Sequence, residues 1–127
     1  MFIDETDTKY DMSATLGGGN DKFVITNAEV TGDLNVNSGA GNDQLCMKYV
    51  ETGSTRLATG AGDDVFEMGD VDLGVASNLN LGGGADSVSI IGPVAGTGTL
   101  NGSIGMDQIE NTAAIGGLGL TGFEKYA

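Results

Sequence analysis

A glycine-rich motif that ends in aspartate recurs along this chain at a nearly constant interval. Its copies read GGGND, GAGND, GAGDD, GGGAD and, less regularly, GSIGMD. The aspartates that close the copies follow one another after 22, 21, 22 and 21 residues, and they are Asp21, Asp43, Asp64, Asp86 and Asp107. A constant period in this range indicates a solenoid, in which each period forms one coil that stacks on the next.

Apolar residues hold the same register on both sides of the motif. They lie two and four residues after the aspartates, which is the period-two pattern of a strand with one buried face. These positions are Phe23, Ile25, Leu45, Met47, Phe66, Met68, Val88, Ile90 and Ile109. Apolar residues seven positions ahead of the aspartate predict a second strand, at Val36, Leu57, Leu79 and Leu100. A further glycine marks a second turn midway through each period, at Gly32, Gly53, Gly74 and Gly96.

Every coil repeats the same elements in the same direction, so neighbouring coils must pair in parallel. The sequence therefore predicts an all-β fold, a parallel β-helix or β-roll of about five coils spaced about 4.8 Å apart. We expect one solenoid domain over 1–127, with an N-terminal cap at 1–11, the repeats at 12–110 and a final coil or C-terminal cap at 111–127. The pattern leaves open whether the coil has two sides or three. Outward asparagines could bond from coil to coil or simply face solvent, and they are Asn35, Asn37, Asn78, Asn80 and Asn101.

The charge of the chain restricts its partners. It carries 18 acidic and 5 basic residues, a formal net charge of −13. This charge disfavours nucleic acid, anionic membranes and phosphate ligands, and it makes cations the natural counterpart. No apolar run approaches the roughly 20 residues that span a bilayer. Residues 1–12 contain no apolar stretch of the kind found in a secretory signal.

The Gly-x-Gly-x-Asp turn is the candidate site. Glycine tolerates positive φ, so the carbonyls of the turn can be directed toward one side. Stacking places each aspartate one coil from the next, and two carboxylates about 5 Å apart repel by roughly 3 kcal/mol at an effective dielectric near 20. A divalent cation between adjacent turns reverses the sign of that interaction. An all-oxygen ligand set suits Ca²⁺ better than Mg²⁺. Zinc prefers cysteine and histidine ligands, and this chain has one cysteine and no histidine.

The repeats resemble those of the RTX, or haemolysin-type calcium-binding, proteins, whose motif is G-G-x-G-x-D-x-U-x. The matching segments are LGGGNDKFV, SGAGNDQLC, TGAGDDVFE and LGGGADSVS. The resemblance implies a right-handed parallel β-roll with Ca²⁺ between neighbouring turns. It assigns side-chain ligands to Asp21, Asp43, Asp64 and Asp86, and Asp107 becomes a partial ligand or cap because Ser103 replaces a motif glycine. The carbonyl ligands that it implies belong to Gly17, Gly19, Gly39, Gly41, Gly60, Gly62, Gly82 and Gly84.

The same resemblance implies a setting. It places the chain in a bacterial protein that is secreted or exposed at the cell surface, and it suggests type I secretion, with folding on exposure to extracellular calcium. One motif per coil, in place of the family's two, predicts a single row of ions and a wider coil. An enzyme is not expected, since nucleophilic catalysis lacks a histidine base and no convergent acid pair is evident outside the metal row.

Three alternatives stay open. The turns could stack without metal, each closed by an Asx-type hydrogen bond. The solenoid could be an adhesion or surface-layer module that self-associates, as a homo-oligomer or beside covalent neighbouring domains, through an exposed apolar tail around Leu118 to Phe123. It could also be the accessory domain of a polysaccharide-active enzyme. Asp63 is expected to face water beside Asp64, and Cys46 is expected to point outward without a redox role.

Overall fold

The computed structural model describes residues 1–4, 7–105, 107–110, 115–123 and 125–126. The strands of this part of the chain are β1 (Phe2–Asp4), β2 (Asp7–Thr8), β3 (Met12–Thr15), β4 (Lys22–Asn37), β5 (Gln44–Ala58), β6 (Val65–Asp72), β7 (Ser77–Asn80), β8 (Ser87–Ile90), β9 (Val94–Asn101), β10 (Gln108–Glu110), β11 (Ile115–Thr121) and β12 (Lys125–Tyr126). The described residues include no helix, and so none with the length and hydropathy to cross a membrane.

Successive coils pair in parallel and in the register that the repeats predict. The outgoing halves of the coils pair in the order β1, β4, β5, β6, β8, β10 and β12. The returning halves pair in the order β3, β4, β5, β7, β9 and β11. The fold is a parallel β-solenoid of about five coils, which confirms the predicted fold class.

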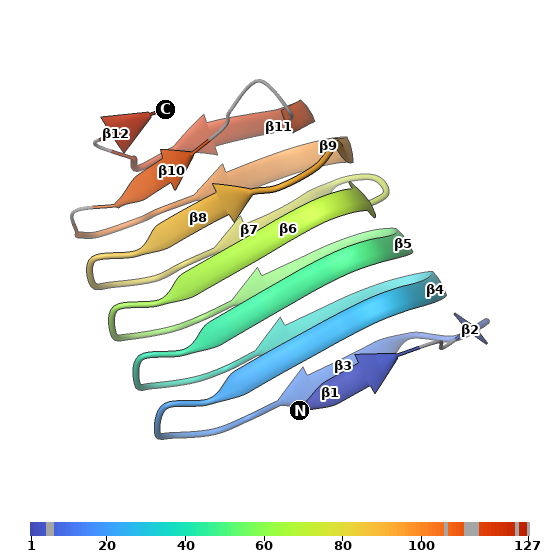
Figure 1. The fold of residues 1–127 in the computed structure, drawn as a ribbon, viewed down its shortest axis with the longest axis horizontal. Coiled ribbons are helices and arrows are strands. Elements are labelled where there is room, and N and C mark those ends of the chain that lie inside the picture. The colour runs from blue at the N-terminus through green and yellow to red at the C-terminus, as the bar shows by residue number, and fades with distance from the viewer. Residues whose placement is uncertain (5–6, 106, 111–114, 124, 127) are drawn as a thin grey trace.

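Each coil has two layers of strands (Figure 1). The chain runs out along one layer, turns at the right-hand end of the picture and returns along the layer behind, and the glycine turns join the layers at the left. β4 and β5 are single strands of 16 and 15 residues that contribute to both layers. The outgoing layer also has a corner where Asn27, Tyr49 and Asp70 adopt φ angles of 50°, 55° and 53°.

The space between the layers is the hydrophobic core. Every apolar position predicted to face inward in the two strands of the repeat is buried, and these side chains form one cluster. Phe23 and Phe66, two coil levels apart, expose none of their surface. Burial of such side chains contributes about 1.5–3 kcal/mol each, so the repeating core stabilises the stack in the absence of any ligand.

The two ends continue the coil. β1 and β2 pair with β4 in coil register, with Phe2 opposite Val24, so the segment expected to be an N-terminal cap is part of a coil. At the other end Leu118 and Phe123 are only 8% and 7% exposed. The predicted exposed apolar tail is therefore wrong, because the final coil turns these side chains into the core. Residues 111–114, 124 and 127 of that predicted final segment lie outside the described residues.

Candidate functional site

The glycine turns stack so closely that the motif glycines from the second turn to the fourth have no room for a side chain. The motif glycines have φ angles between +87° and +140°, and they are Gly17, Gly19, Gly39, Gly41, Gly60, Gly62, Gly82 and Gly84. A Cβ atom on Gly41 would lie 1.9 Å from the carbonyl oxygen of Gly19 in the preceding coil. Glycine is therefore required here both by conformation and by contact.

The motif carbonyls point along the stack toward the next coil. The first glycine of each turn accepts a hydrogen bond there, as Gly17 does from the Ala40 N–H at 3.2 Å and Gly60 from the Gly83 N–H at 2.8 Å. The carbonyl oxygen of the second glycine lies where a Cβ atom of the second glycine in the next turn would be, as that of Gly41 does for Gly62, at 2.0 Å. A cation bound at the first-glycine carbonyls would have to share oxygens that already accept a hydrogen bond from the next coil. The role of both sets of carbonyls as ligands stays a prediction.

The aspartate side chains turn into the solenoid. Asp43, Asp64 and Asp86 are each 1% exposed and Asp107 is fully buried, whereas Asp21 in the first turn is partly buried. Each carboxylate beyond the first accepts a hydrogen bond from the backbone N–H of the aspartate one coil earlier. The Oδ1 atoms of Asp43, Asp64, Asp86 and Asp107 accept these bonds at 2.8–2.9 Å. The aspartates thus form a buried ladder along the whole row of turns.

The second carboxylate oxygen is the unusual feature of this ladder. Oδ2 is buried in Asp21, Asp43, Asp64 and Asp86, and no hydrogen bond of ordinary geometry reaches it from the described residues, although the Thr59 hydroxyl lies close enough to Asp64 to lower the pKa of that carboxyl group. Buried polar atoms are almost always paired, and an unpaired one costs about 1–3 kcal/mol or more when charged. The structure therefore brings together the predicted aspartates and leaves each of these four with one oxygen available to a partner.

The interior position raises the pKa of two of these carboxyl groups. Burial raises the pKa of Asp86 to about 7, and the charges of Asp107 and Asp64 add to this rise while the Asp64 N–H opposes it. Burial also raises the pKa of Asp64, against the lowering effects of the Thr59 hydroxyl and the Asp43 N–H. The charged forms of Asp64 and Asp86 therefore need a compensating partner.

Hydroxyl groups at the position five residues before the aspartate line part of the ladder. The Ser38 hydroxyl donates to the Thr59 carbonyl at 3.1 Å, and the buried Thr59 hydroxyl donates to the Leu81 carbonyl. In the last turn this position is Gly102, where a Cβ would lie 2.6 Å from Asp107 Oδ2. The motif did not point to these residues, although a polar residue in an otherwise apolar column was a visible signal.

The residues before the first three aspartates form a second ladder on the outside of the turns. Asn20 Oδ1 accepts from the Asn42 N–H at 2.9 Å, Asn42 Oδ1 from the Asp63 N–H at 3.0 Å, and Asp63 Oδ1 from the Ala85 N–H at 2.8 Å. Asp63 is exposed, as expected, but it also links two coils. The asparagine ladder thus lies in the turn. On the strand, Asn80 and Asn101 accept from N–H groups of their own turns, at Gly82 and Ser103.

Side chains alone do not complete a metal site. Within the part of the chain that the structure describes, no three Asp, Glu, Cys or His side chains gather so that they could hold a metal ion. Calcium takes six to eight oxygens. An ion between two aspartates would need backbone carbonyls and water for the rest of its shell.

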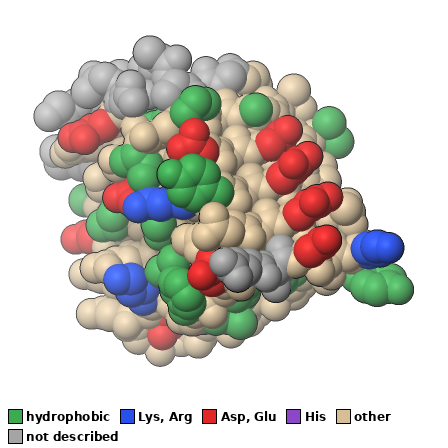
Figure 2. Space-filling model, turned by 45° about the vertical axis from the view of Figure 1, so that its right-hand side comes forward, with side chains coloured by type: hydrophobic (Ala, Val, Ile, Leu, Met, Phe, Trp, Pro, Cys, Tyr) green, Lys and Arg blue, Asp and Glu red, His purple; other side chains and the backbone are tan. Residues whose placement is uncertain are grey.

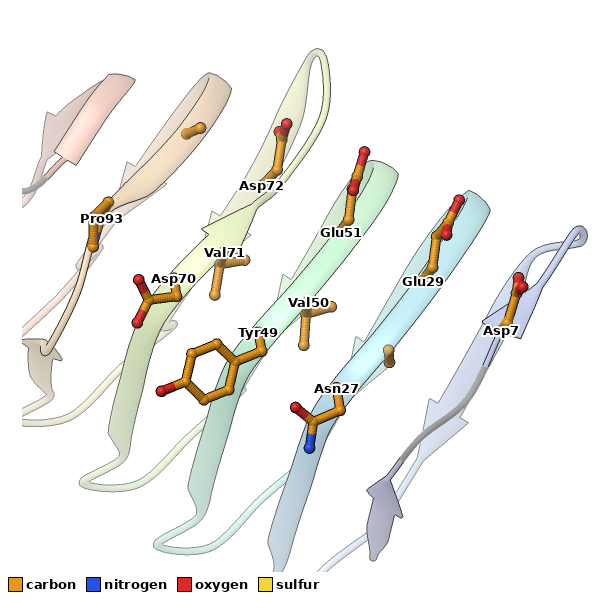
Figure 3. Close-up of a pocket in the computed structure, with 12 residues that line it drawn as sticks. Asp7, Asn27, Glu29, Tyr49, Val50, Glu51, Asp70, Val71, Asp72 and Pro93 are labelled. Carbon is orange, nitrogen blue, oxygen red and sulfur yellow. The ribbon is translucent and has the colours of Figure 1, made fainter.

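A different row of carboxylates lies on the outer surface of the outgoing layer. Asp7, Glu29, Glu51 and Asp72 are opposite one another on successive coils and all are exposed. They line an open groove of about 700 Å³, in which Figure 3 shows their side chains in one row beside Tyr49. Figure 2 shows acidic side chains gathered in a row on this flank of the molecule. The sequence carried this signal, because the four acids recur at 22, 22 and 21 residues.

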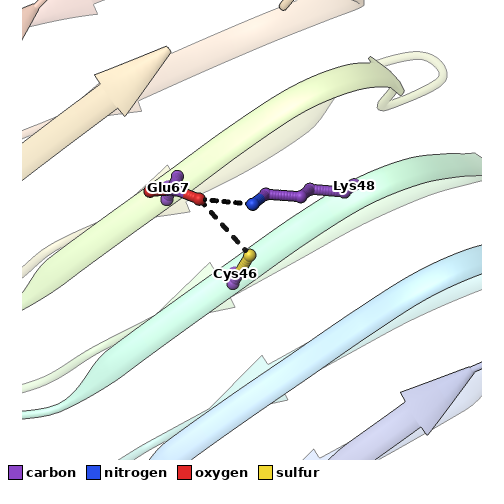
Figure 4. Close-up of polar contacts among 3 residues, drawn as sticks. All are labelled: Cys46, Lys48 and Glu67. Carbon is purple, nitrogen blue, oxygen red and sulfur yellow. Dashed lines mark hydrogen bonds and ion pairs between the residues drawn. The ribbon is translucent and has the colours of Figure 1, made fainter. Parts of the chain in front are cut away.

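Cys46 lies on the outer face of β5, as predicted, and is half-buried. Its Sγ is 3.8 Å from Glu67 Oε1, and the same carboxylate forms a 2.8 Å ion pair with Lys48 (Figure 4). Burial raises the pKa of the thiol, with Lys48 opposing this and Glu67 reinforcing it. A raised pKa lowers the thiolate fraction and with it the reactivity of the thiol.

Comparison with protein-family models, curated proteins and solved structures finds no match to this chain.

Proposed function

We propose that this protein is a calcium-binding β-solenoid module whose coils are held rigid by Ca²⁺ at the buried ladder of aspartates. The observation that carries the proposal is the set of buried, unpartnered Oδ2 atoms in Asp21, Asp43, Asp64 and Asp86. Without a ligand, a row of such oxygens one coil apart destabilises the fold. A cation bound between two of them would turn this repulsion into attraction.

The donor chemistry fits calcium. The carboxylates and the glycine carbonyls of the turns are hard oxygen donors, which Ca²⁺ prefers and which suit zinc poorly. The aspartates would supply the charge, with Asp64 shared between its two neighbours Asp43 and Asp86. When bound, the ion supplies electrostatic compensation and no chemistry. No reaction is proposed for this chain.

Calcium binding would then be coupled to folding. A site assembled from consecutive coils does not exist in the unfolded chain, so the binding free energy adds to the folding free energy. For one site, calcium at 100 times its Kd stabilises the fold by about 2.7 kcal/mol. We propose that the module works outside a bacterial cell, in a secreted or surface protein, because calcium there is abundant and the repeats resemble those of calcium-dependent exported proteins.

The test is a calcium titration of chelator-treated protein, followed by circular dichroism, thermal unfolding and calorimetry. We expect saturable heat of binding and a rise of the melting temperature with calcium, each reversed by chelator. Asp64→Asn removes the charge shared by two gaps and should abolish much of the rise. Asp63→Asn is the matched control, because Asp63 is exposed and its replacement keeps an oxygen for the Ala85 N–H.

The competing explanation is a stack that needs no metal, and the Oδ1 ladder favours it because that ladder already links each turn to the next. In that case Asp64 and Asp86, whose pKa values are raised by burial, would be held as neutral acids. If neither calcium nor chelator changes the circular dichroism signal of the strands or the melting temperature, this explanation is correct and our proposal is wrong.

A further inference from the structure

One inward position of the turn differs in chemistry from coil to coil. It is the residue five places before the aspartate, directly after the returning strand. The residues just ahead of it pair in register along the stack, and they are Thr15, Asn37, Ala58, Asn80 and Asn101. The position itself is therefore one column, which reads Leu16, Ser38, Thr59, Leu81 and Gly102 from the first turn to the fifth.

This column lies beside the second carboxylate oxygen of the aspartates. A Cβ atom added to Gly102 would lie 2.6 Å from Oδ2 of Asp107 in the same turn. In the third turn, the Thr59 hydroxyl lies close enough to Asp64 to oppose the rise in pKa that burial causes there. Because the turns stack in register, the fully buried Ser38 has the same place in the second turn. The contacts of each Oδ2 atom thus depend on this one residue.

The second and third turns have a hydroxyl group at this position, whereas the first and fourth have a leucine. Ser38 and Thr59 are fully buried, and Leu81 is 1% exposed. A leucine offers a carboxylate no polar contact, and burial of a charge without such a contact is costly. The gap between the second and third turns, here called the hydroxyl gap, differs from the gaps next to it because it has a hydroxyl group on both sides.

The proton of each hydroxyl group already has an acceptor. The Ser38 hydroxyl donates to the Thr59 carbonyl at 3.1 Å, and the Thr59 hydroxyl donates to the Leu81 carbonyl. A hydroxyl group has one proton and two lone pairs, so Thr59 cannot satisfy the Leu81 carbonyl and the Asp64 carboxylate at once. With a cation in the gap, the proton can stay on the carbonyl, and the lone pairs of the hydroxyl oxygen are available to the ion.

We infer that Ser38 and Thr59 are additional oxygen ligands, and that they make the hydroxyl gap the tightest calcium site of the ladder. The inference rests on the proposed function and ranks its sites. Asp43 and Asp64 with the two hydroxyl groups bring four side chains with hard oxygens to this gap. Calcium takes six to eight oxygens, so backbone carbonyls and water would complete its shell. The neighbouring gaps, each bordered by a leucine, should fill at higher calcium concentrations.

The order in which the gaps fill can be measured in the unaltered protein. Isotope-labelled, chelator-treated protein is titrated with calcium alone, and the backbone amides are followed by NMR. The Asp21 and Asp43 N–H groups report on the hydroxyl gap, because they donate to Oδ1 of Asp43 and Asp64. The Asp86 N–H donates to Asp107 Oδ1 and reports on the last gap. We expect the first two amides to shift with the first equivalent of calcium, and the Asp86 amide to shift only at higher concentrations.

A matched pair of variants at Thr59 separates the hydroxyl group from the shape of the side chain. Thr59→Val keeps the shape and removes the oxygen, whereas Thr59→Ser keeps the oxygen and removes a methyl group. In calorimetry, Thr59→Val should weaken the tightest calcium site about tenfold or more, and Thr59→Ser should largely retain it. Thr55→Val is the control, because the hydroxyl of the buried Thr55 bonds to that of Thr52, away from the aspartates. It should lower stability and leave the calcium affinity unchanged.

Three results would overturn the inference. They are an Asp86 amide that shifts together with those of Asp21 and Asp43, a Thr59→Val variant that binds calcium as tightly as the unaltered protein, and an affinity that is lower in Thr59→Ser than in Thr59→Val. In each case calcium still binds, so the proposed function stands. If Thr59→Val does not fold, the NMR titration of the unaltered protein decides. Absence of both binding heat and amide shifts would contradict the calcium proposal itself and this inference with it.

Discussion

The solenoid carries two rows of carboxylates at the same spacing, and they differ in almost every physical respect. The row in the glycine turns is buried, and its members accept backbone hydrogen bonds from the coil before. The row made of Asp7, Glu29, Glu51 and Asp72 is exposed along an open groove. Equal spacing gives similar distances between charges, so the difference between the rows comes from solvent.

The exposed carboxylates are solvated by water, whereas the buried ones need another partner. Exposed charges interact through a high dielectric and are screened by salt, so their mutual repulsion is small. Buried carboxylates lose their hydration, which raises the pKa of Asp64 and Asp86 and leaves the Oδ2 atoms in need of a partner. A periodic row of acids is therefore a candidate site only where the fold also buries it.

The largest expected effect on stability is seen when one acid of the buried row and, in a separate variant, one acid of the exposed row are neutralised in saturating calcium. Asp64→Asn should lower the free energy of unfolding by about 5 kcal/mol, because two shared sites each stabilise the fold by about 2.7 kcal/mol at 100 times their Kd. Glu51→Gln should change it by less than about 1 kcal/mol. Urea unfolding of both variants, with and without chelator, measures the difference.

Unfolding in chelator separates the contribution of calcium to stability from the contribution of packing. Without calcium, Asp64→Asn should be neutral or stabilising, since it removes a buried charge and keeps an oxygen for the Asp43 N–H. A variant equally destabilised in calcium and in chelator would show that calcium is not the reason why Asp64 stabilises the fold.

The pH dependence of the metal-free protein is the next largest effect. The pKa of Asp86 is raised from 3.8 to about 7 in the folded state, so between these values the folded chain holds a proton that the unfolded chain has released. Stability from this group is present at low pH and is lost as the pH rises through that window. The loss amounts to at most about 4 kcal/mol, from 1.36 kcal/mol for each pKa unit.

Unfolding measured from pH 5 to pH 8 in chelator checks this expectation. Asp86→Asn should flatten the profile, and Glu51→Gln should leave it unchanged. Saturating calcium should oppose the slope, because the ion favours the charged carboxylate. Stability that rises with pH in the absence of metal would contradict the assignment of Asp86 as a buried acid.

The sequence predicted the column and its stacking because both follow from periodicity. A motif that recurs every 21 or 22 residues, with apolar positions in phase, can bury those positions only by stacking in parallel. The inward direction of the aspartates did not follow, because a turn of this pattern could direct its acid to either side. The two-layer cross-section was also undecided, since it depends on corners at Asn27, Tyr49 and Asp70, whose residue types do not demand positive φ.

Side-chain ladders were harder to foresee than strands. Outward asparagines on the strand were the expected candidates, but the ladder uses Asn20, Asn42 and Asp63 within the turn. A turn offers backbone N–H groups without a strand partner, whereas those of a strand are already paired with the next coil. Candidate ladders in solenoids are therefore better sought beside the turn glycines than along the strands.

A glycine replacement tests how closely the buried row depends on its turn. Gly41→Ala places a Cβ 1.9 Å from the Gly19 carbonyl oxygen at a φ of +135°. We expect a loss of about 3 kcal/mol from strain and overpacking together. Gly18→Ala, where a Cβ would meet nothing closer than 3.9 Å, should cost less than about 1 kcal/mol. Thermal unfolding compares the two variants, and equal losses would mean that the turns do not stack as closely as the structure places them.

The smallest expected effect belongs to the exposed row. Replacing Glu29 and Glu51 together by glutamine removes adjacent like charges from β4 and β5, which are directly opposite each other. Like charges opposite one another are mildly destabilising in a sheet, so the double variant should be more stable by less than about 1 kcal/mol at low ionic strength. The gain should vanish in about 1 M salt, where the Debye length is about 3 Å. Urea unfolding at the two ionic strengths measures both. A variant that is instead less stable, and only when calcium is present, would show that the exposed groove also holds an ion and that burial is not what distinguishes the two rows.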